Sequence, residues 1–113
     1  MSKKIVIVGA LGYLGTELCK LYSGESWFNK VVAIDSRFVS ERISQLNDWN
    51  IEFHQGHILD KEFMKRTLKE TDIAYHLAGI TDVAYIKKIA IEGTNNILNA
   101  IPKNVKLYFL QPM

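Results

Sequence analysis

Short hydrophobic runs alternate along this chain with longer stretches in which hydrophobic residues recur at helical spacing. Run 5–8 is uniformly apolar and rich in β-branched residues, which is typical of a central strand covered on both faces. Run 51–54 alternates between polar and apolar residues and fits a strand nearer the sheet edge. Strands are therefore predicted at 5–8, 31–34, 51–54, 73–77 and 105–110.

The stretches between these runs predict helices. The first follows strand 5–8 directly, with Leu14, Leu18 and Leu21 along one inward face, and ends at Gly24 in the left-handed conformation that favours glycine. Segment 37–50 is polar with scattered apolar positions and predicts one irregular helix.

Two later helices carry clearer signals. Asp60 is a suitable N-cap for a helix over 61–70, with a buried face made of Phe63, Met64, Thr67 and Leu68. Asp82 is a candidate cap for the next helix, and Pro102 marks its end. The inward face of that helix is predicted to comprise Ile86, Ala90, Gly93, Ile97 and Ala100.

The alternation of strands and helices predicts an α/β fold. We expect a Rossmann-type, doubly wound parallel sheet of about five strands in the order 3-2-1-4-5, between two helical layers. The 113 residues are expected to form one domain, 1–113, with a single hydrophobic sheet core.

Composition narrows the function classes. The chain is 48% hydrophobic and 23% charged, with a formal net charge of +2, and its charges of both signs are interspersed. These values are typical of a globular protein, and they favour neither nucleic acid nor a membrane as a partner. The default expectation is a cytoplasmic location. Cys19 is predicted to be a small core residue. The three histidines lack metal-ligand spacing, so no metal site is expected.

The loop Gly9-Ala10-Leu11-Gly12-Tyr13-Leu14-Gly15 is the strongest functional signal, because it follows an apolar strand and opens a helix. Gly9 allows a tight turn, Gly12 allows the backbone to approach a diphosphate, and Gly15 allows close packing of helix and strand. The amides of Tyr13 and Leu14 are expected to face the anion. The alternative is a tight strand-to-helix turn without a ligand, although a turn alone would not need the third glycine.

Asp35 lies about twenty residues after the loop, at the end of the second strand, where a carboxylate accepts hydrogen bonds from the adenosine ribose. It predicts NAD in preference to NADP, because a carboxylate repels a 2′-phosphate. Ser36 belongs to the same candidate site, and Arg37 weakens the preference for NAD. The alternative reading of Asp35 is a simple turn residue.

Four segments in order resemble the extended short-chain dehydrogenases, the NAD-dependent epimerase and dehydratase family. Besides the G-x-x-G-x-x-G loop 9–15, they are Gly-His-Ile-Leu-Asp at 56–60, Tyr-His-Leu-Ala-Gly at 75–79 and Ile-Glu-Gly-Thr-Asn-Asn-Ile-Leu at 91–98. The resemblance implies that His57 and Ile58 lie against the adenine. It also implies that Leu77, Ala78 and Gly79 pass the ribose and the nicotinamide side.

The family's chemistry uses a serine or threonine after the fifth strand and a Tyr-x-x-x-Lys pair on the next helix. Neither occurs in this sequence, so no catalytic residue is assigned and the chain alone is not expected to catalyse. The resemblance therefore implies the NAD-binding portion of an epimerase or dehydratase that acts on a nucleotide sugar by transient hydride transfer. The alternative is a non-catalytic Rossmann module that senses a nucleotide or supports a partner subunit.

The implied ligands are a dinucleotide and, in a complete enzyme only, a sugar substrate. The fifth strand of so short a sheet would present an open edge unless another segment or chain covers it, so a homo-oligomer is possible.

Overall fold

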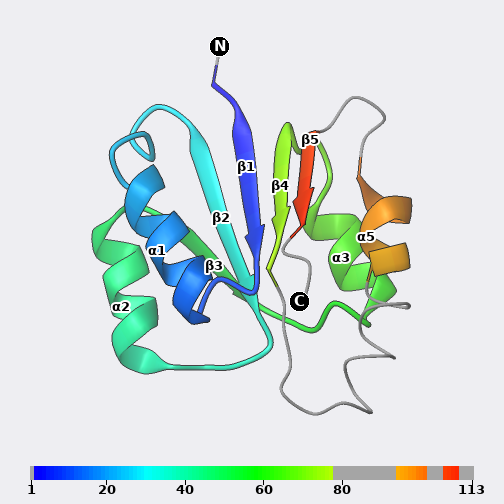
Figure 1. Cartoon of the computed structure of the whole chain (residues 1–113), viewed down its shortest axis with the longest axis horizontal. Coiled ribbons are helices and arrows are strands. Elements are labelled where there is room, and N and C mark those ends of the chain that lie inside the picture. The colour runs from blue at the N-terminus through cyan, green and yellow to red at the C-terminus, as the bar shows by residue number, and fades with distance from the viewer. Residues whose placement is uncertain (1, 78–93, 102–105, 110–113) are drawn as a thin grey trace.

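The strands assemble into one parallel sheet in the order β3-β2-β1-β4-β5 (Figure 1). This computed structural model describes residues 2–77, 94–101 and 106–109. The strands are β1 (Lys4–Val8), β2 (Lys30–Asp35), β3 (Glu52–Gln55), β4 (Ile73–His76) and β5 (Lys106–Phe109). The predicted fold class, strand order and edge position of the third strand are confirmed.

β1 is the central strand, as its uniform hydrophobicity predicts. Val6 is paired with Val32 of β2 on one side and with Ala74 of β4 on the other. Residues Ile5, Val6, Ile7 and Val8 are all buried, because helices cover both faces of the strand.

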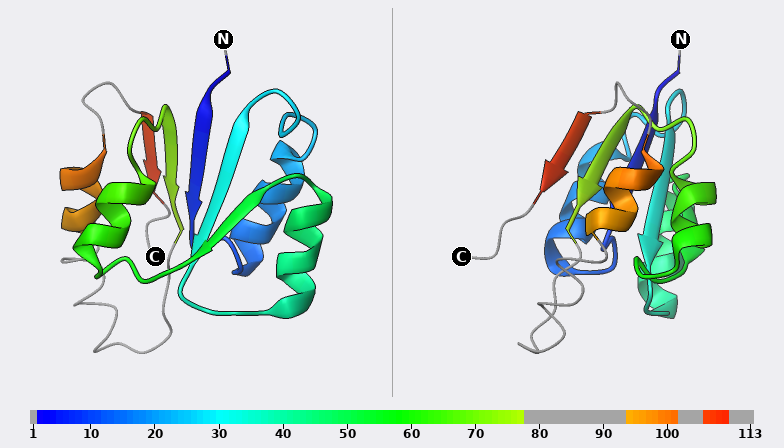
Figure 2. Two further views of the ribbon diagram at one scale, coloured as in Figure 1. Left: turned by 180° about the vertical axis from the view of Figure 1, so that it is seen from behind. Right: turned by 90° about the vertical axis from the view of Figure 1, so that its right-hand side faces the viewer.

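Helices α1 (Tyr13–Tyr22) and α2 (Ser40–Asp48) lie on one side of the sheet, and α3 (Lys61–Thr67) and α5 (Thr94–Ala100) lie on the other (Figures 1 and 2). Alternate residues of β1 separate accordingly into two cores. Ile5 and Ile7 pack in the core under α1 and α2, and Val6 and Val8 in the core under α3 and α5. The single core expected from the chain length is therefore divided by the sheet into two, which hold the three layers together.

The inward face of α1 differs from the predicted one. Leu21 is 77% exposed and Leu14 is 46% exposed, whereas Gly15 and Cys19 are buried. The close approach of the helix at Gly15 turns Leu18 and Cys19, three and four positions later, toward the sheet, so Leu18 packs against the core as predicted. Leu14 and Leu21 lie outside this buried face. The predicted end of the helix is confirmed, because Ser23 is the C-cap and Gly24 follows it at C′. The predicted conformation is wrong, since Gly24 does not adopt a positive φ.

The Asp60 cap is confirmed, since its side chain accepts a hydrogen bond from the Phe63 amide at 3.1 Å. The predicted buried face of this helix is confirmed as well, but α3 ends at Thr67 rather than at residue 70. Glu70 has a φ of 62°, and this left-handed turn directs the chain into β4. The irregular helix expected within 37–50 is α2.

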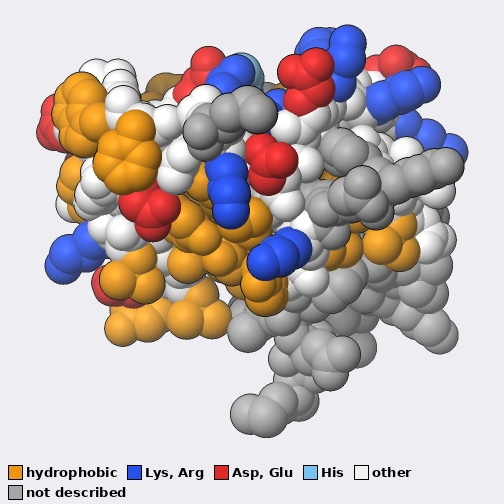
Figure 3. All heavy atoms as spheres, turned by 90° about the horizontal axis from the view of Figure 1, so that it is seen from above, with side chains coloured by type: hydrophobic (Ala, Val, Ile, Leu, Met, Phe, Trp, Pro, Cys, Tyr) orange, Lys and Arg blue, Asp and Glu red, His pale blue; other side chains and the backbone are white. Residues whose placement is uncertain are grey.

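The helix predicted from Asp82 lies largely outside the described residues, as do Ile86, Ala90 and Gly93. Its described part is α5, where Ile97 is fully buried and Ala100 packs against the same core. Within the described residues, no helix is both long and apolar enough to cross a membrane. Seen from the end at which β1 begins, hydrophobic side chains are exposed on the side of α1 and α2 (Figure 3).

Candidate functional site

The glycine loop connects the end of β1 to α1 and is anchored to the neighbouring strand. The amides of Gly9 and Ala10 both donate to the Ile34 carbonyl of β2, at 2.8 and 3.1 Å. Gly9 has a φ of 86°, a conformation that side-chain-bearing residues rarely adopt. The first glycine therefore fixes a sharp turn at the carboxyl edge of the sheet.

Gly15 serves packing within the protein. A Cβ atom at this position would lie 2.2 Å from the Gly9 carbonyl oxygen and 2.7 Å from the Ala10 Cα. Both are backbone atoms that cannot move aside without displacing the loop. The third glycine is thus explained by contact between helix and loop, so its presence does not distinguish a ligand-binding loop from a simple turn.

Gly12 differs from Gly15, because packing within the protein does not explain why it is a glycine. A Cβ atom here would meet the Gly9 oxygen at 3.5 Å and Arg37 Nη2 at 3.6 Å, which are ordinary contacts. Neither the φ of −74° nor the packing of the protein requires glycine at this position. A glycine that the fold does not need, at the N-cap of a helix, fits a loop that a diphosphate approaches closely.

The residues after Gly12 present the N-terminus of α1 to solvent. Tyr13 is 80% exposed, and Gly12 at the N-cap has no side chain that could satisfy the first amides of the helix. The first turn contains no acidic residue. The first-turn amides of Tyr13 and Leu14, which lack intrahelical acceptors, and the positive end of the helix dipole suit an anion here.

Asp35 ends β2 beside this loop, and its carboxylate is almost completely buried. Oδ2 accepts the Leu11 amide at 2.9 Å and Arg37 Nη2 at 3.1 Å, and Oδ1 accepts the amide and Nε of Arg37, both at 3.0 Å. Burial acts to raise the pKa of Asp35, but the hydrogen bonds from Arg37 and Leu11 outweigh it and hold that pKa below its usual value. The carboxylate is ionised and ties the loop to β2.

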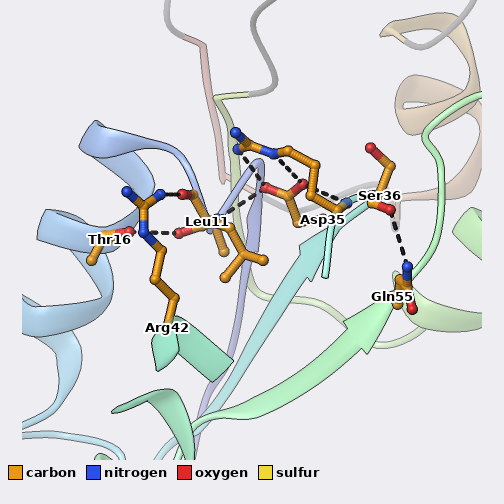
Figure 4. A network of polar contacts seen from close by, with 8 residues as sticks. Leu11, Thr16, Asp35, Ser36, Arg42 and Gln55 are labelled. Atoms are coloured by element: carbon orange, nitrogen blue, oxygen red, sulfur yellow. Dashed lines mark hydrogen bonds and ion pairs between the residues drawn. The ribbon is translucent and has the colours of Figure 1, made fainter. Parts of the chain in front are cut away.

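Two further residues support the site without having been singled out in the sequence. Arg42 of α2 donates to the Leu11 carbonyl, and Gln55 of β3 donates to the Ser36 carbonyl at 3.2 Å (Figure 4). Ser36 is exposed beside Asp35. Neither Arg42 nor Gln55 belongs to a local motif, because each reaches the site from a different element of the fold.

The segment after β3 passes the same edge of the sheet. The Gly56 amide donates to the Asp35 carbonyl at 3.0 Å, so 56–60 lies next to the end of β2. His57 is half-buried, and its Nδ1 accepts the Leu59 amide at 3.1 Å. Ile58 is buried in the core under α3 and α5, and its carbonyl accepts Asn96 Nδ2 at 2.9 Å. The contacts of His57 and Ile58 with an adenine stay predictions.

Gly56 is a further packing residue that the motif alone did not explain. A Cβ atom there would lie 2.4 Å from the Phe63 ring. The glycine therefore allows α3 to approach the segment that follows β3.

Leu77 follows β4, and its amide donates to the Val8 carbonyl at 2.8 Å, next to the start of the glycine loop. The predicted site residues Ala78 and Gly79 lie outside the described residues. Across ranges 2–77, 94–101 and 106–109, no group of three histidine, cysteine or acidic residues could hold a metal ion. The structure thus brings loop 9–15, segment 35–37, segment 56–58 and Leu77 to one edge of the sheet.

Comparison with known proteins gives a consistent family. The 3-beta hydroxysteroid dehydrogenase/isomerase family matches residues 6–108. A dTDP-D-glucose 4,6-dehydratase of Dictyostelium discoideum is 31% identical over 103 residues, a match that covers 85% of this chain and 24% of the dehydratase. The chain thus spans about a quarter of the length of that relative.

Solved structures share the fold. ADP-L-glycero-D-manno-heptose-6-epimerase of Helicobacter pylori superposes with a TM-score of 0.78 at 21% identity, covering 96% of this chain and 38% of the epimerase. UDP-glucose-4-epimerase of Stenotrophomonas maltophila, solved with NAD and formylated UDP-arabinopyranose, gives a TM-score of 0.71 at 23% identity over 95% of this chain and 36% of the epimerase. The chain therefore belongs to the 3-beta hydroxysteroid dehydrogenase/isomerase family, within the NAD-dependent epimerase and dehydratase enzymes that its motifs resemble.

Proposed function

We propose that this chain is the dinucleotide-binding portion of an NAD-dependent epimerase or dehydratase. The observation that carries the proposal is the missing side chain at Gly12, which neither the backbone conformation nor the packing of the protein requires. The family match supports it. The NAD bound to the related epimerase of S. maltophila supports a cofactor of the same type here.

The pyrophosphate is assigned to the N-terminus of α1. The amides of Tyr13 and Leu14 would donate to the phosphate oxygens, and the absence of a side chain on Gly12 would allow the backbone to approach them. A bound dinucleotide of this type accepts or returns a hydride. The residues of this chain would hold and orient it.

The remaining cofactor contacts follow from the positions of the neighbouring segments. We assign the adenosine ribose to the vicinity of Asp35, Ser36 and Arg37, and the adenine to His57 and Ile58. Leu77, beside the start of the loop, would lie toward the nicotinamide side, together with Ala78 and Gly79.

The substrate of the whole enzyme is proposed to be a nucleotide sugar, oxidised transiently and reduced again. The named activity of the Dictyostelium relative supports a nucleotide sugar. Residues that recognise such a substrate are not among those assigned in this chain. A cytoplasmic location and a possible homo-oligomer stay predictions.

Isothermal titration of the 113-residue chain with NAD, NADP and ADP tests the binding proposal. We expect saturable binding of ADP, because it carries the diphosphate that the loop is assigned to bind. Binding should be weak, since the contacts to the second nucleotide are incomplete. A folded chain that binds none of the three ligands would overturn the proposal.

A further inference from the structure

Two aromatic side chains project from the loop between α1 and β2, and we call Trp27 and Phe28 the aromatic projection. Trp27 is 73% exposed and Phe28 is 65% exposed, and neither packs in a hydrophobic core. The loop lies at the end of the sheet where the strands begin, opposite the glycine loop (Figure 1). Neighbouring large apolar residues that stay exposed are typical of an interaction surface, and tryptophan is enriched where partners bind tightly.

The loop holds the aromatic projection in a fixed place. Ser26 is buried, its Oγ donates to the Trp49 carbonyl, and its own carbonyl accepts Asn50 Nδ2 at 2.8 Å. The Phe28 amide donates to the Glu25 carbonyl at 3.1 Å. A projection that is already ordered loses little conformational entropy when a partner binds it.

A hollow of about 600 Å³ lies beside this loop, between α2 and the start of β3. Its apolar lining comes from Ile43, Ile51 and Phe53. The hydrogen bonds of Ser26 to residues 49 and 50 place the loop next to it, because residues 47, 48, 51 and 52 also line the hollow. Binding pockets for small organic molecules measure about 300 to 1,000 Å³, so the hollow is large enough for an aromatic side chain.

The hollow and the projection are complementary in chemistry. A docked tryptophan requires an apolar surface for its ring and an acceptor for its indole N–H. The hollow offers both, since its lining includes side-chain oxygens of Ser44 and Asn47 besides the apolar residues. Trp27 does not enter the hollow of its own chain, because its side chain stays exposed. One chain therefore carries both halves of a contact that it does not make with itself.

We propose that a second copy of this chain docks here, and that the aromatic projection of each copy enters the hollow of the other. Because the projection and the hollow lie side by side, a two-fold axis can form the contact twice. β3 is the outermost strand, so within the described residues no further strand lies beside the hollow. The pair would leave the glycine loop open at the opposite edge. The inference is independent of the proposed function, and it uses a different surface from the open edge of the fifth strand.

Sedimentation equilibrium of the 113-residue chain tests the proposal. We expect a reversible equilibrium between monomer and dimer for the wild type. Trp27→Ala should raise the dimer dissociation constant about a hundredfold or more, because the contact is lost in both copies. Ser44→Arg places a long side chain at the hollow and should have a similar effect. Phe38→Ala is the matched control, because Phe38 is also 65% exposed but belongs to neither the projection nor the hollow.

Mixing the two variants separates this arrangement from any other dimer. Trp27→Ala retains an open hollow and Ser44→Arg retains the projection, so a mixed pair recovers one of the two contacts. We expect the mixture to associate more strongly than either variant alone and more weakly than the wild type. Circular dichroism establishes that both variants are folded.

Three results would overturn the proposal. The first is a wild-type chain that stays monomeric at concentrations up to about 1 mM. The second is a dimer that Trp27→Ala does not weaken. The third is a mixture of the two folded variants that associates no better than each variant alone.

Discussion

At the scale of single residues, the three loop glycines differ in whether the fold requires them. Gly9 is required by its φ of 86°, Gly15 by a backbone contact, and Gly12 by neither. The sequence motif predicted a special role for each, and the close packing at Gly15 is confirmed. The motif alone could not separate these cases, because the conformation of Gly9 and the contacts at Gly15 and Gly12 depend on how the loop is folded.

Substitution of Gly15 by alanine tests the packing role. The new methyl group would lie 2.2 Å from the Gly9 oxygen, and we expect the free energy of unfolding to fall by about 3 kcal/mol. Gly24→Ala is the control, because a Cβ there meets no atom within 4 Å. Urea unfolding measures both, and similar midpoints for the two variants would contradict the packing role.

The buried carboxylate of Asp35 makes stability depend on pH. Its pKa is lowered in the folded state, so its contribution is present above the unfolded pKa of about 3.9 and is lost as pH falls through the folded value. We expect Asp35→Asn to unfold at lower urea concentration near neutral pH and to lose less stability than the wild type on acidification below about pH 4.

Urea unfolding at several pH values measures this difference. Asp48→Asn, a change at an exposed position of α2, is the control and should follow the wild type. Parallel pH profiles for the wild type and Asp35→Asn would show that the Asp35 hydrogen bonds do not stabilise the ionised form.

At the scale of elements, the sequence predicted which helices and strands exist and in what order. It predicted less well which face of a helix is buried and where a helix ends. The spacing of hydrophobic residues identified the strands and α3, because in each element the hydrophobic residues are the ones that are buried. The facing of α1 was predicted correctly for Leu18, which packs against the core, and wrongly for Leu14 and Leu21, which are exposed. The contact at Gly15 determines the rotation instead, and Leu21 remains exposed. The sequence period of α1 is compatible with both rotations, so only the packed loop selects one.

The reactivity of Cys19 tests which face of α1 is buried. It lies on the buried face of α1, is fully buried, and burial raises the pKa of its thiol to about 12. We expect no measurable reaction with an aromatic disulfide reagent at pH 8 in the folded protein, and rapid reaction in denaturant, because the thiolate is the reactive species. Rapid reaction under native conditions would place Cys19 on the surface and contradict the observed facing.

At the scale of the whole molecule, the sheet separates two cores and brings the site residues to one edge. Segments 9–15, 35–37 and 56–58 are distant in sequence, but each follows a parallel strand, so their meeting was predictable from topology. The hydrogen bonds that Arg42, Gln55 and Asn96 make there were not, because they join side chains and backbone of different elements.

The core under α3 and α5 should dominate stability on its side of the sheet. Met64 of α3 is fully buried there, and Met64→Ala should lower the free energy of unfolding by about 2 to 5 kcal/mol. The exposed neighbour Lys65→Ala should change it by less than about 0.5 kcal/mol. Urea unfolding compares them, and equal effects would contradict the assignment of this core.

The central claim is that the glycine edge of the sheet binds a dinucleotide, and a backbone amide map by nuclear magnetic resonance tests it most directly. On titration with NAD, we expect the amide signals of Gly12, Tyr13, Leu14 and Arg37 to shift together and saturably. The hollow of about 600 Å³ lies between α2 and the start of β3, lined by residues that include Ile43 and Phe53. The amide signals of these lining residues should not shift. Shifts confined to that hollow, or no shifts in a folded chain, would contradict the account.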